Sequence, residues 1–179
     1  MKGFIFTNFV EFVEANHGLE MVDEMITNCH LPSEGIYSPF NSYDFDELVS
    51  LLTYVSEKTK VNPEILLEQF GVFVFPYLIG KHSYIINHYD NPMDLIAGVE
   101  NHIHIEVRKL YNDADLPTFR VVEQTEKKLT VIYKSSKGLT YLALGLMKET
   151  LNHFKVNGLV TIDQSFEAKE GVKFTIELD

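Results

Sequence analysis

The sequence contains one cysteine, few basic residues and no long apolar segment. Cys29 has no second cysteine to pair with, so an intramolecular disulfide and a zinc site built from several cysteines are both excluded. Fifteen Lys and Arg face 26 Asp and Glu, and the net charge of -11 repels phosphate backbones and anionic membranes. Residues 1–18 lack a signal-peptide pattern, and no stretch approaches the roughly 18 apolar residues of a membrane-spanning helix. We therefore expect a cytoplasmic protein with neither a nucleic-acid partner nor a membrane partner.

The residues that are present suit a single globular domain over 1–179. The length of the chain and its 45% hydrophobic content are sufficient for a substantial core. The sequence has no internal repeat, low-complexity tract or linker. Apolar residues at helical spacing predict an N-terminal helical subdomain over 1–60, with helices at 4–15, 19–29 and about 44–60.

The remaining residues, 61–179, predict a subdomain of helices and a sheet. Asn62-Pro63 begins a largely apolar helix to residue 79, in which Gly71 indicates close approach by another backbone or by a flat ligand. Helical spacing returns at 92–111 and 139–155, between segments of period two. Those segments predict two hairpins, with strands at 118–124, 129–135, 160–165 and 172–178. The expected fold class is α+β, with packed helices and a four-stranded antiparallel sheet in the second half.

The stretch HIHIEVRKLY holds candidate metal-binding histidines, and its chemistry depends on its conformation. As a strand, it would put His102, His104 and Glu106 on one face, a plausible metal site for a small non-heme metalloenzyme. As a helix from Pro92 to Tyr111, it would send the two histidines to opposite flanks of an apolar stripe. About twenty residues without a turn signal favour the helix. The stripe would contain Leu95, Ile96, Val99, Ile103, Val107 and Leu110.

Helical spacing alone does not choose between the two histidines. It gives His104 more apolar neighbours than His102, but on this pattern a structural or surface histidine is more frequent than a metal ligand. The phenylalanine-rich first helix is equally ambiguous. It fits ordinary core packing, the wall of an apolar cofactor pocket, or a slot for a fatty ligand.

Further features coincide with His104. Pro117 follows it by thirteen residues, and Tyr133, Ser135 and Lys137 lie in the motif YKSSK between the predicted strands and a helix. Together with the opening MKG, these residues resemble the heme-nitric oxide/oxygen-binding (H-NOX) family, which is related to the heme domain of soluble guanylate cyclase. The resemblance covers essentially the whole chain. It implies that the cofactor is heme b and that the second half of the chain binds it.

The resemblance assigns roles by position. His104 resembles the proximal histidine that binds the heme iron, and Pro117 resembles the proline that presses on the porphyrin. Tyr133 and Ser135 match the first two residues of the family's Tyr-x-Ser-x-Arg motif, which holds the heme propionates. Lys137 stands where that motif has arginine. A lysine offers a point charge instead of a planar fork of donors, so this is a departure from the family pattern.

The same resemblance predicts which gas is bound. Oxygen binding to ferrous iron is stabilised by a distal hydrogen-bond donor, which nitric oxide needs far less. Where oxygen-binding relatives have a tyrosine, this chain has Leu142. Its neighbour Tyr141 lies about 100° around the helix, and an alignment shifted by one residue would place Tyr141 at that position instead. The other residues expected on the distal side also lack a donor, namely Ile5, Phe9, Val74, Leu78 and Leu146. We therefore expect binding of nitric oxide and CO without stable oxygen binding.

The resemblance also implies a sensor that is not itself an enzyme. Nitric oxide binding would weaken the bond between iron and His104, and relaxation of the heme against Pro117 and Ile5 would shift the N-terminal helices relative to the sheet. Residues 1–179 contain no recognisable kinase or cyclase domain. Signalling is therefore expected in trans, to a sensor histidine kinase or a cyclic-di-nucleotide enzyme.

Overall fold

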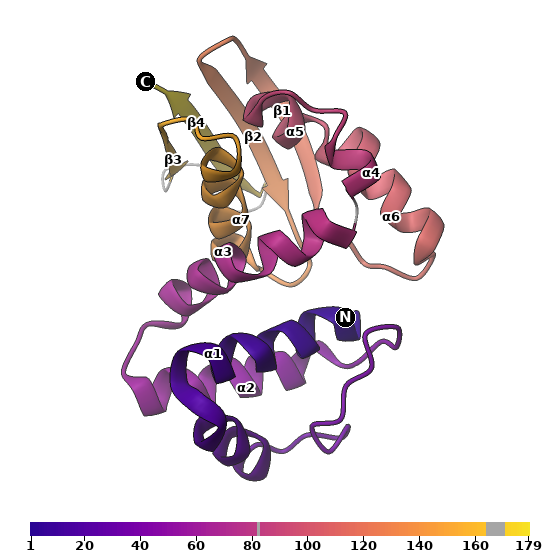
Figure 1. Ribbon diagram of the computed structural model, residues 1–179, viewed down its shortest axis with the longest axis vertical. Helices are drawn as coiled ribbons and strands as arrows, with labels where there is room; N and C mark the ends of the chain where they lie inside the picture. The colour runs from indigo at the N-terminus through magenta and orange to yellow at the C-terminus, as the bar shows by residue number, and fades with distance from the viewer. Residues whose placement is uncertain (82, 164–170) are drawn as a thin grey trace.

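The N-terminal part of the fold is helical. The computed structural model describes residues 1–81, 83–163 and 171–179. α1 (Gly3–Asn28) leaves the helical conformation at Gly18, whose φ is 84°, so the two expected helices follow one another with a break between them. Asp44 accepts a hydrogen bond from the backbone N of Asp46 and thereby begins α2 (Phe45–Thr59). Figure 1 shows α1 and α2 packed together at one end of the molecule.

Two glycines allow α3 (Pro63–Lys81) to cross α7 (Thr140–His153) at very short range. A Cβ added to Gly145 would overlap the backbone oxygen of Glu68 and lie 3.0 Å from the Cα of Gly71. A Cβ added to Gly71 would likewise lie 3.0 Å from the Cα of Gly145. The close approach expected at Gly71 is therefore an approach between two helix backbones.

The stretch around His104 is helical. Its elements are α4 (Ser83–Ile86), α5 (Pro92–Ala97), the π-helical turn η1 (Val99–Ile103) and α6 (His104–Leu110). Asn91 begins α5 by accepting a hydrogen bond from the backbone N of Asp94 at 2.9 Å. The strand interpretation is therefore wrong, and so is the non-heme metalloenzyme that required three side chains on one strand face.

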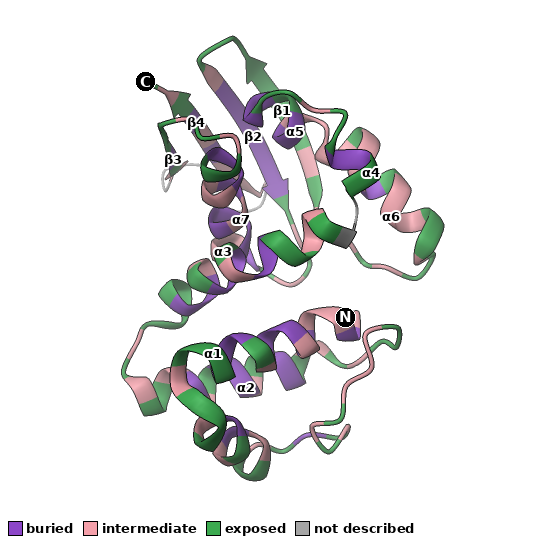
Figure 2. Cartoon of the chain, in the orientation of Figure 1, coloured by how far each residue is buried: buried purple, intermediate pink, exposed green. Residues whose placement is uncertain are grey.

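The sheet contains four antiparallel strands. They are β1 (Thr118–Gln124), β2 (Lys128–Lys134), β3 (Gly158–Asp163) and β4 (Val172–Leu178), in the spatial order β1-β2-β4-β3. This arrangement confirms the α+β class, while residues 164–165 of the third expected strand lie outside the described residues. α5 and α7 lie against the sheet (Figure 1), and Figure 2 shows that β2 is largely buried.

Buried apolar side chains form two clusters. The helical cluster joins α1, α2, α3 and the beginning of α7, and includes Phe9, Phe70 and Val74. The sheet cluster joins α5 and α7 to β2, β3 and β4, and includes Tyr133 and Phe174. Because the helical cluster uses residues of α3 and α7, its core extends beyond residue 60. The division of the chain at residue 60 stays a prediction.

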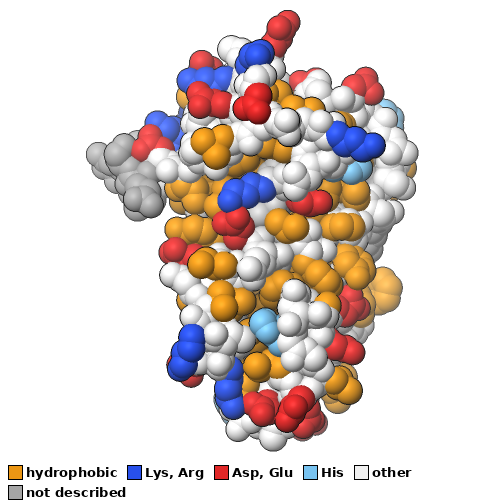
Figure 3. Space-filling view, turned by 60° about the vertical axis from the view of Figure 1, so that its left-hand side comes forward, with side chains coloured by type: hydrophobic (Ala, Val, Ile, Leu, Met, Phe, Trp, Pro, Cys, Tyr) orange, Lys and Arg blue, Asp and Glu red, His pale blue; other side chains and the backbone are white. Residues whose placement is uncertain are grey.

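The surface carries the excess of acidic residues. Figure 3 shows hydrophobic side chains across the middle of one face and a group of acidic side chains at its lower end. Within the described parts of the chain, no helix has the length and apolar character needed to cross a membrane.

Candidate functional site

His104 is a buried imidazole whose Nδ1 faces a carboxylate. It is the first residue of α6, directly after the π-helical turn, and its exposed fraction is 8%. Its Nδ1 lies 3.2 Å from Oε2 of Glu100, whereas Nε2 has no hydrogen-bond partner among the described residues. Burial lowers the pKa of His104, although the hydrogen bond to Glu100 partly opposes this effect. The neutral imidazole, which is the form that binds metals, is therefore favoured.

Glu100 connects His104 to the beginning of the sheet. Its Oε2 also accepts a hydrogen bond from the backbone N of Phe119 at 3.2 Å, and its Oε1 accepts one from Nη2 of Arg108 at 3.3 Å. Burial acts to raise the pKa of Glu100. The hydrogen bonds from His104, Phe119 and Arg108 together outweigh burial, so the pKa lies below its ordinary value. The carboxylate is therefore kept ionised beside the histidine.

A row of aromatic rings continues from His104 into the sheet. The ring centroid of Phe119 lies 5.8 Å from that of His104 and 5.3 Å from that of Tyr133, which in turn lies 6.0 Å from Phe174. Pro117 is half-buried, just before β1. Phe119 was not anticipated from the sequence, because its contact with His104 depends on how β1 meets α6. Phe119 places the segment that follows Pro117 beside the histidine.

The structure brings Tyr133, Ser135 and Lys137 together at the end of β2. Burial raises the pKa of Tyr133, whose hydroxyl is hydrogen-bonded to Ser135. The backbone N of Lys137 donates to Oγ of Ser135 at 3.1 Å. The Nζ of Lys137 forms an ion pair with Asp115, which also accepts a hydrogen bond from Ser136 at 3.0 Å. Asp115 was not anticipated from the sequence, and it already forms an ion pair with Lys137.

All six apolar residues expected on the distal side meet in the helical cluster. Phe9, Val74 and Leu142 are buried, and Ile5, Leu78 and Leu146 pack against them while partly exposed. They come from α1, α3 and α7, which are far apart in the sequence. None of these six side chains carries a hydrogen-bond donor.

Tyr141, the neighbour of Leu142, directs its hydroxyl elsewhere. The hydroxyl is hydrogen-bonded to Glu64 near the beginning of α3, and this bond is the main reason that the pKa of Tyr141 is raised. Leu142 has an exposed fraction of 9% and lies inside the helical cluster. Tyr141 also packs against the helical cluster, but from a partly exposed position, so the two neighbours differ in burial and, of the two, Tyr141 alone brings a hydroxyl to the cluster.

His102 and Glu106 each have partners of their own. His102 Nδ1 lies 2.8 Å from the hydroxyl of Tyr89, and Glu106 accepts a hydrogen bond from Nζ of Lys109 at 2.5 Å. Across the described ranges of the chain, no three His, Cys, Asp or Glu side chains form a group able to hold a metal ion.

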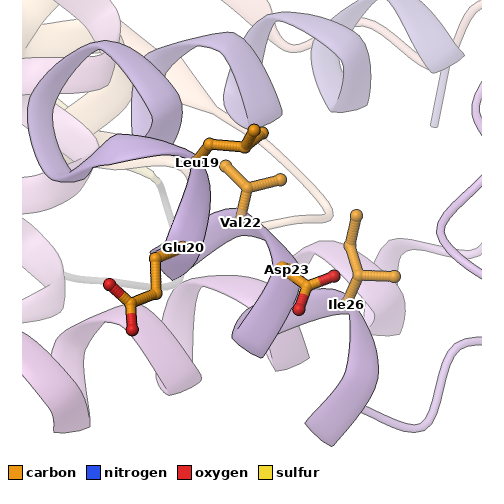
Figure 4. Close-up of a pocket in the computed structure, with 5 residues that line it drawn as sticks. All are labelled: Leu19, Glu20, Val22, Asp23 and Ile26. Carbon is orange, nitrogen blue, oxygen red and sulfur yellow. The ribbon is translucent and has the colours of Figure 1, made fainter.

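A surface hollow on α1 is unrelated to these residues. Figure 4 shows that it lies on the segment of α1 that follows Gly18. Its lining is made of three apolar side chains and two carboxylates, from Leu19, Glu20, Val22, Asp23 and Ile26. None of the residues selected from the sequence contributes to it.

The chain is similar to one known family and to several solved structures. The model of the family described as Haem-NO-binding matches residues 2–162. The unliganded Fe(II) H-NOX protein from K. algicida is 41% identical, with a TM-score of 0.94 over 100% of this chain and 97% of that chain. The S. oneidensis H-NOX protein in the Fe(II)NO state is 26% identical, with a TM-score of 0.89 over 100% and 99% of the two chains. The Shewanella woodyi H-NOX in the Fe(II)CO state is 32% identical, with a TM-score of 0.84 over 99% and 94%. Comparison with curated proteins found no match.

Proposed function

We propose, from the premise that this chain belongs to the Haem-NO-binding family of heme-based gas sensors, that it is a ferrous sensor of nitric oxide and CO that does not bind oxygen stably. Its cofactor is heme b and its iron ligand is His104. It acts as a cytoplasmic sensor without catalytic activity of its own. Its signal passes in trans to a sensor histidine kinase or a cyclic-di-nucleotide enzyme.

The surroundings of His104 carry this proposal, because they fit a heme iron. The imidazole is buried and neutral, its Nδ1 is engaged by Glu100, and its Nε2 has no partner among the described residues. A single imidazole is a common axial ligand of heme iron. When bound, the heme supplies a ferrous iron that takes up a diatomic gas. His104 supplies Nε2, and Glu100 holds the ring in place.

Tyr133, Ser135 and Lys137 fit the polar edge of a heme. Two hydroxyls and one ammonium group are suitable partners for the two propionate carboxylates. Lys137 must exchange its ion pair with Asp115 for a propionate, or share its three donors between them. This competition, and the lack of a planar guanidinium fork, predict a looser propionate contact than an arginine would give.

The apolar cluster supports discrimination against oxygen. Phe9, Val74 and Leu142 are buried and have no donor, and the hydroxyl of Tyr141 is hydrogen-bonded to Glu64. A distal pocket without a donor does not stabilise the negative charge that oxygen binding produces. Nitric oxide and CO depend much less on such a donor.

The transmission of the signal rests on two connections to the site. Glu100 ties His104 to the backbone of Phe119, two residues after Pro117. Ile5 belongs to α1 and packs against the helical cluster. Release of His104 would loosen α6 and the segment around Pro117, while α1 adjusts through Ile5. A partner that binds one of the two arrangements more tightly would read the change as a population shift.

Replacement of His104 tests the assignment of the iron ligand. We expect His104→Gly to lose the intense Soret band of the wild-type protein and to recover it when imidazole is added. His102→Gly is the matched control, since His102 lies on the same helical run and is hydrogen-bonded to Tyr89. A His104→Gly protein with an unchanged spectrum, or loss of the band in His102→Gly alone, would contradict the proposal.

The gas preference is tested by exposing the ferrous protein to air. We expect no long-lived oxygen complex, but stable complexes with nitric oxide and CO. Leu142→Tyr should introduce a donor and lengthen the lifetime of an oxygen complex, whereas Tyr141→Phe should change nothing. If the wild-type protein forms a stable oxygen complex that Tyr141→Phe abolishes, the donor is Tyr141 and the assignment of Leu142 is wrong.

A further inference from the structure

We propose that Glu100 is a positioning residue for His104, which fixes the tautomer of the imidazole and strengthens its bond to iron. The proposal rests on the function proposed above and adds the group that controls the strength of the proximal bond. The main observation behind the proposal is the distance of 3.2 Å between Nδ1 of His104 and Oε2 of Glu100. The two residues are four positions apart on one helical run, so the contact is set by the local backbone.

The chemistry of Glu100 permits only one tautomer of His104. An ionised carboxylate accepts hydrogen bonds and cannot donate them, so the proton of the neutral imidazole must be on Nδ1. The lone pair is then on Nε2, which has no partner among the residues described. In this tautomer the N–H at Nδ1 donates to Oε2 of Glu100. Glu100 therefore prepares the ring for a ligand at Nε2 before any cofactor is present.

The carboxylate itself cannot move freely. Arg108 holds Oε1 at 3.3 Å, and the backbone N of Phe119 holds Oε2 at 3.2 Å. The side chain of Glu100 is 23% exposed, and that of His104 is 10% exposed. An acceptor held on two sides and largely shielded from water keeps the imidazole ring from rotating. Phe119 belongs to β1, so this contact also links the ring to the segment that follows Pro117.

An anionic acceptor also changes the electron density of the ring. A carboxylate on the second nitrogen makes a ligating imidazole more basic, and loss of such a partner typically lowers metal affinity about 10-fold to 100-fold. With Glu100 in place, His104 is a stronger ligand than a histidine bonded to a neutral acceptor. With heme bound, Glu100 would thereby set how firmly His104 holds the iron.

The first test uses the heme-free protein and does not depend on cofactor binding. Nitrogen-15 NMR of the His104 ring should show the proton on Nδ1 in the wild-type protein and in Glu100→Gln, whose carbonyl can still accept. Glu100→Leu removes the acceptor and should give a mixture of the two tautomers. Glu106→Gln is the matched control, because Glu106 lies on the same helical run and pairs with Lys109.

The second test uses the heme-loaded ferrous protein. The iron-histidine stretching frequency in resonance Raman spectra should fall from wild type to Glu100→Gln and again to Glu100→Leu. Transfer of heme to apomyoglobin should become about tenfold faster in Glu100→Leu. Glu106→Gln should match the wild type in both measurements. Circular dichroism establishes that each variant is folded. If Glu100→Leu does not fold, the lower stretching frequency expected in Glu100→Gln alone still tests the proposal.

The results separate this proposal from the proposed function. Wild-type stretching frequencies and wild-type tautomers in both Glu100 variants would overturn the role of Glu100 while leaving heme sensing intact. A wild-type protein that takes up no heme would overturn the proposed function and, with it, the effect of Glu100 on an iron bond, whereas dependence of the tautomer on Glu100 would still support its control of the imidazole.

Discussion

The substitution Gly145→Ala probes the crossing that brings the distal residues together. The added Cβ would overlap the backbone oxygen of Glu68 and lie 3.0 Å from both the backbone C of Glu68 and the Cα of Gly71. These are backbone atoms, so rotation of a side chain cannot relieve the overlap. The only response is for α3 and α7 to separate, which would loosen the contacts between Val74 and its neighbours on α7.

The expected loss follows from two opposing effects. Overpacking in a well-packed core costs about 1–3 kcal/mol, and backbone neighbours put this site near the upper value, about 3 kcal/mol. Alanine is more favourable than glycine inside a helix by about 1 kcal/mol. The free energy of unfolding should therefore fall by about 2 kcal/mol. For a chain of this size, this corresponds to a decrease in Tm of about 4–8 °C.

Thermal unfolding of the heme-free protein by circular dichroism measures the effect. Gly80→Ala is the matched control, because Gly80 also lies in α3 but a Cβ there would meet no heavy atom within 4 Å. It should keep or raise the Tm, by up to about 4 °C. If Gly145→Ala is as stable as the wild type while Gly80→Ala behaves as expected, the two helices are not packed as tightly as the geometry indicates, and the reasoning is refuted.

Three further predictions concern the polar groups of the site. Because burial lowers the pKa of His104 in the folded state, the unfolded chain takes up a proton first as the pH falls below about 6.5, so the heme-free protein should lose stability there. Urea unfolding at several pH values should show that His104→Phe removes this part of the loss. Lys137→Gln should speed heme release by about 10-fold to 150-fold, because a charged hydrogen bond of roughly 1.5–3 kcal/mol is lost. Asp115→Asn should slow release by up to about fivefold, because it frees Lys137 from a partly exposed ion pair. Slower heme release in Lys137→Gln would contradict the role of Lys137.

Local patterns predicted most elements of the fold but not how they associate. The strands at 118–124 and 172–178 agree with β1 and β4, and the break near Gly18 agrees with its φ of 84°. Periodicity reports which residues share a face, and turn residues report where a segment ends. Neither reports that β2 pairs with β4, with Val131 opposite Phe174, because that contact joins two hairpins separated by a helix.

The candidate site shows the same division between local and distant information. The six apolar residues and the Tyr133 group came from a family resemblance, and they do lie together in the structure. Phe119 and Asp115 were missed because their contacts to His104 and Lys137 depend on how β1 and the loop before it meet other elements. Glu100 was within reach of sequence reasoning, since a carboxylate four residues before a histidine lies on the same face of a helix.

The π-helical turn explains why periodicity could not choose between the two histidines. In η1 the backbone N of Ile103 donates to the oxygen of Gly98, five residues earlier, and His104 donates to Val99 in the same way. One extra residue in a turn rotates every later side chain by about 100° relative to a regular helix. The predicted stripe is therefore correct at Ile96, which is buried, and wrong at Leu110, which is 57% exposed. His104 takes the inward position that a regular helix would have given to residue 103. A single π-turn thus decides which histidine faces the interior, and side-chain hydrophobicity does not encode it.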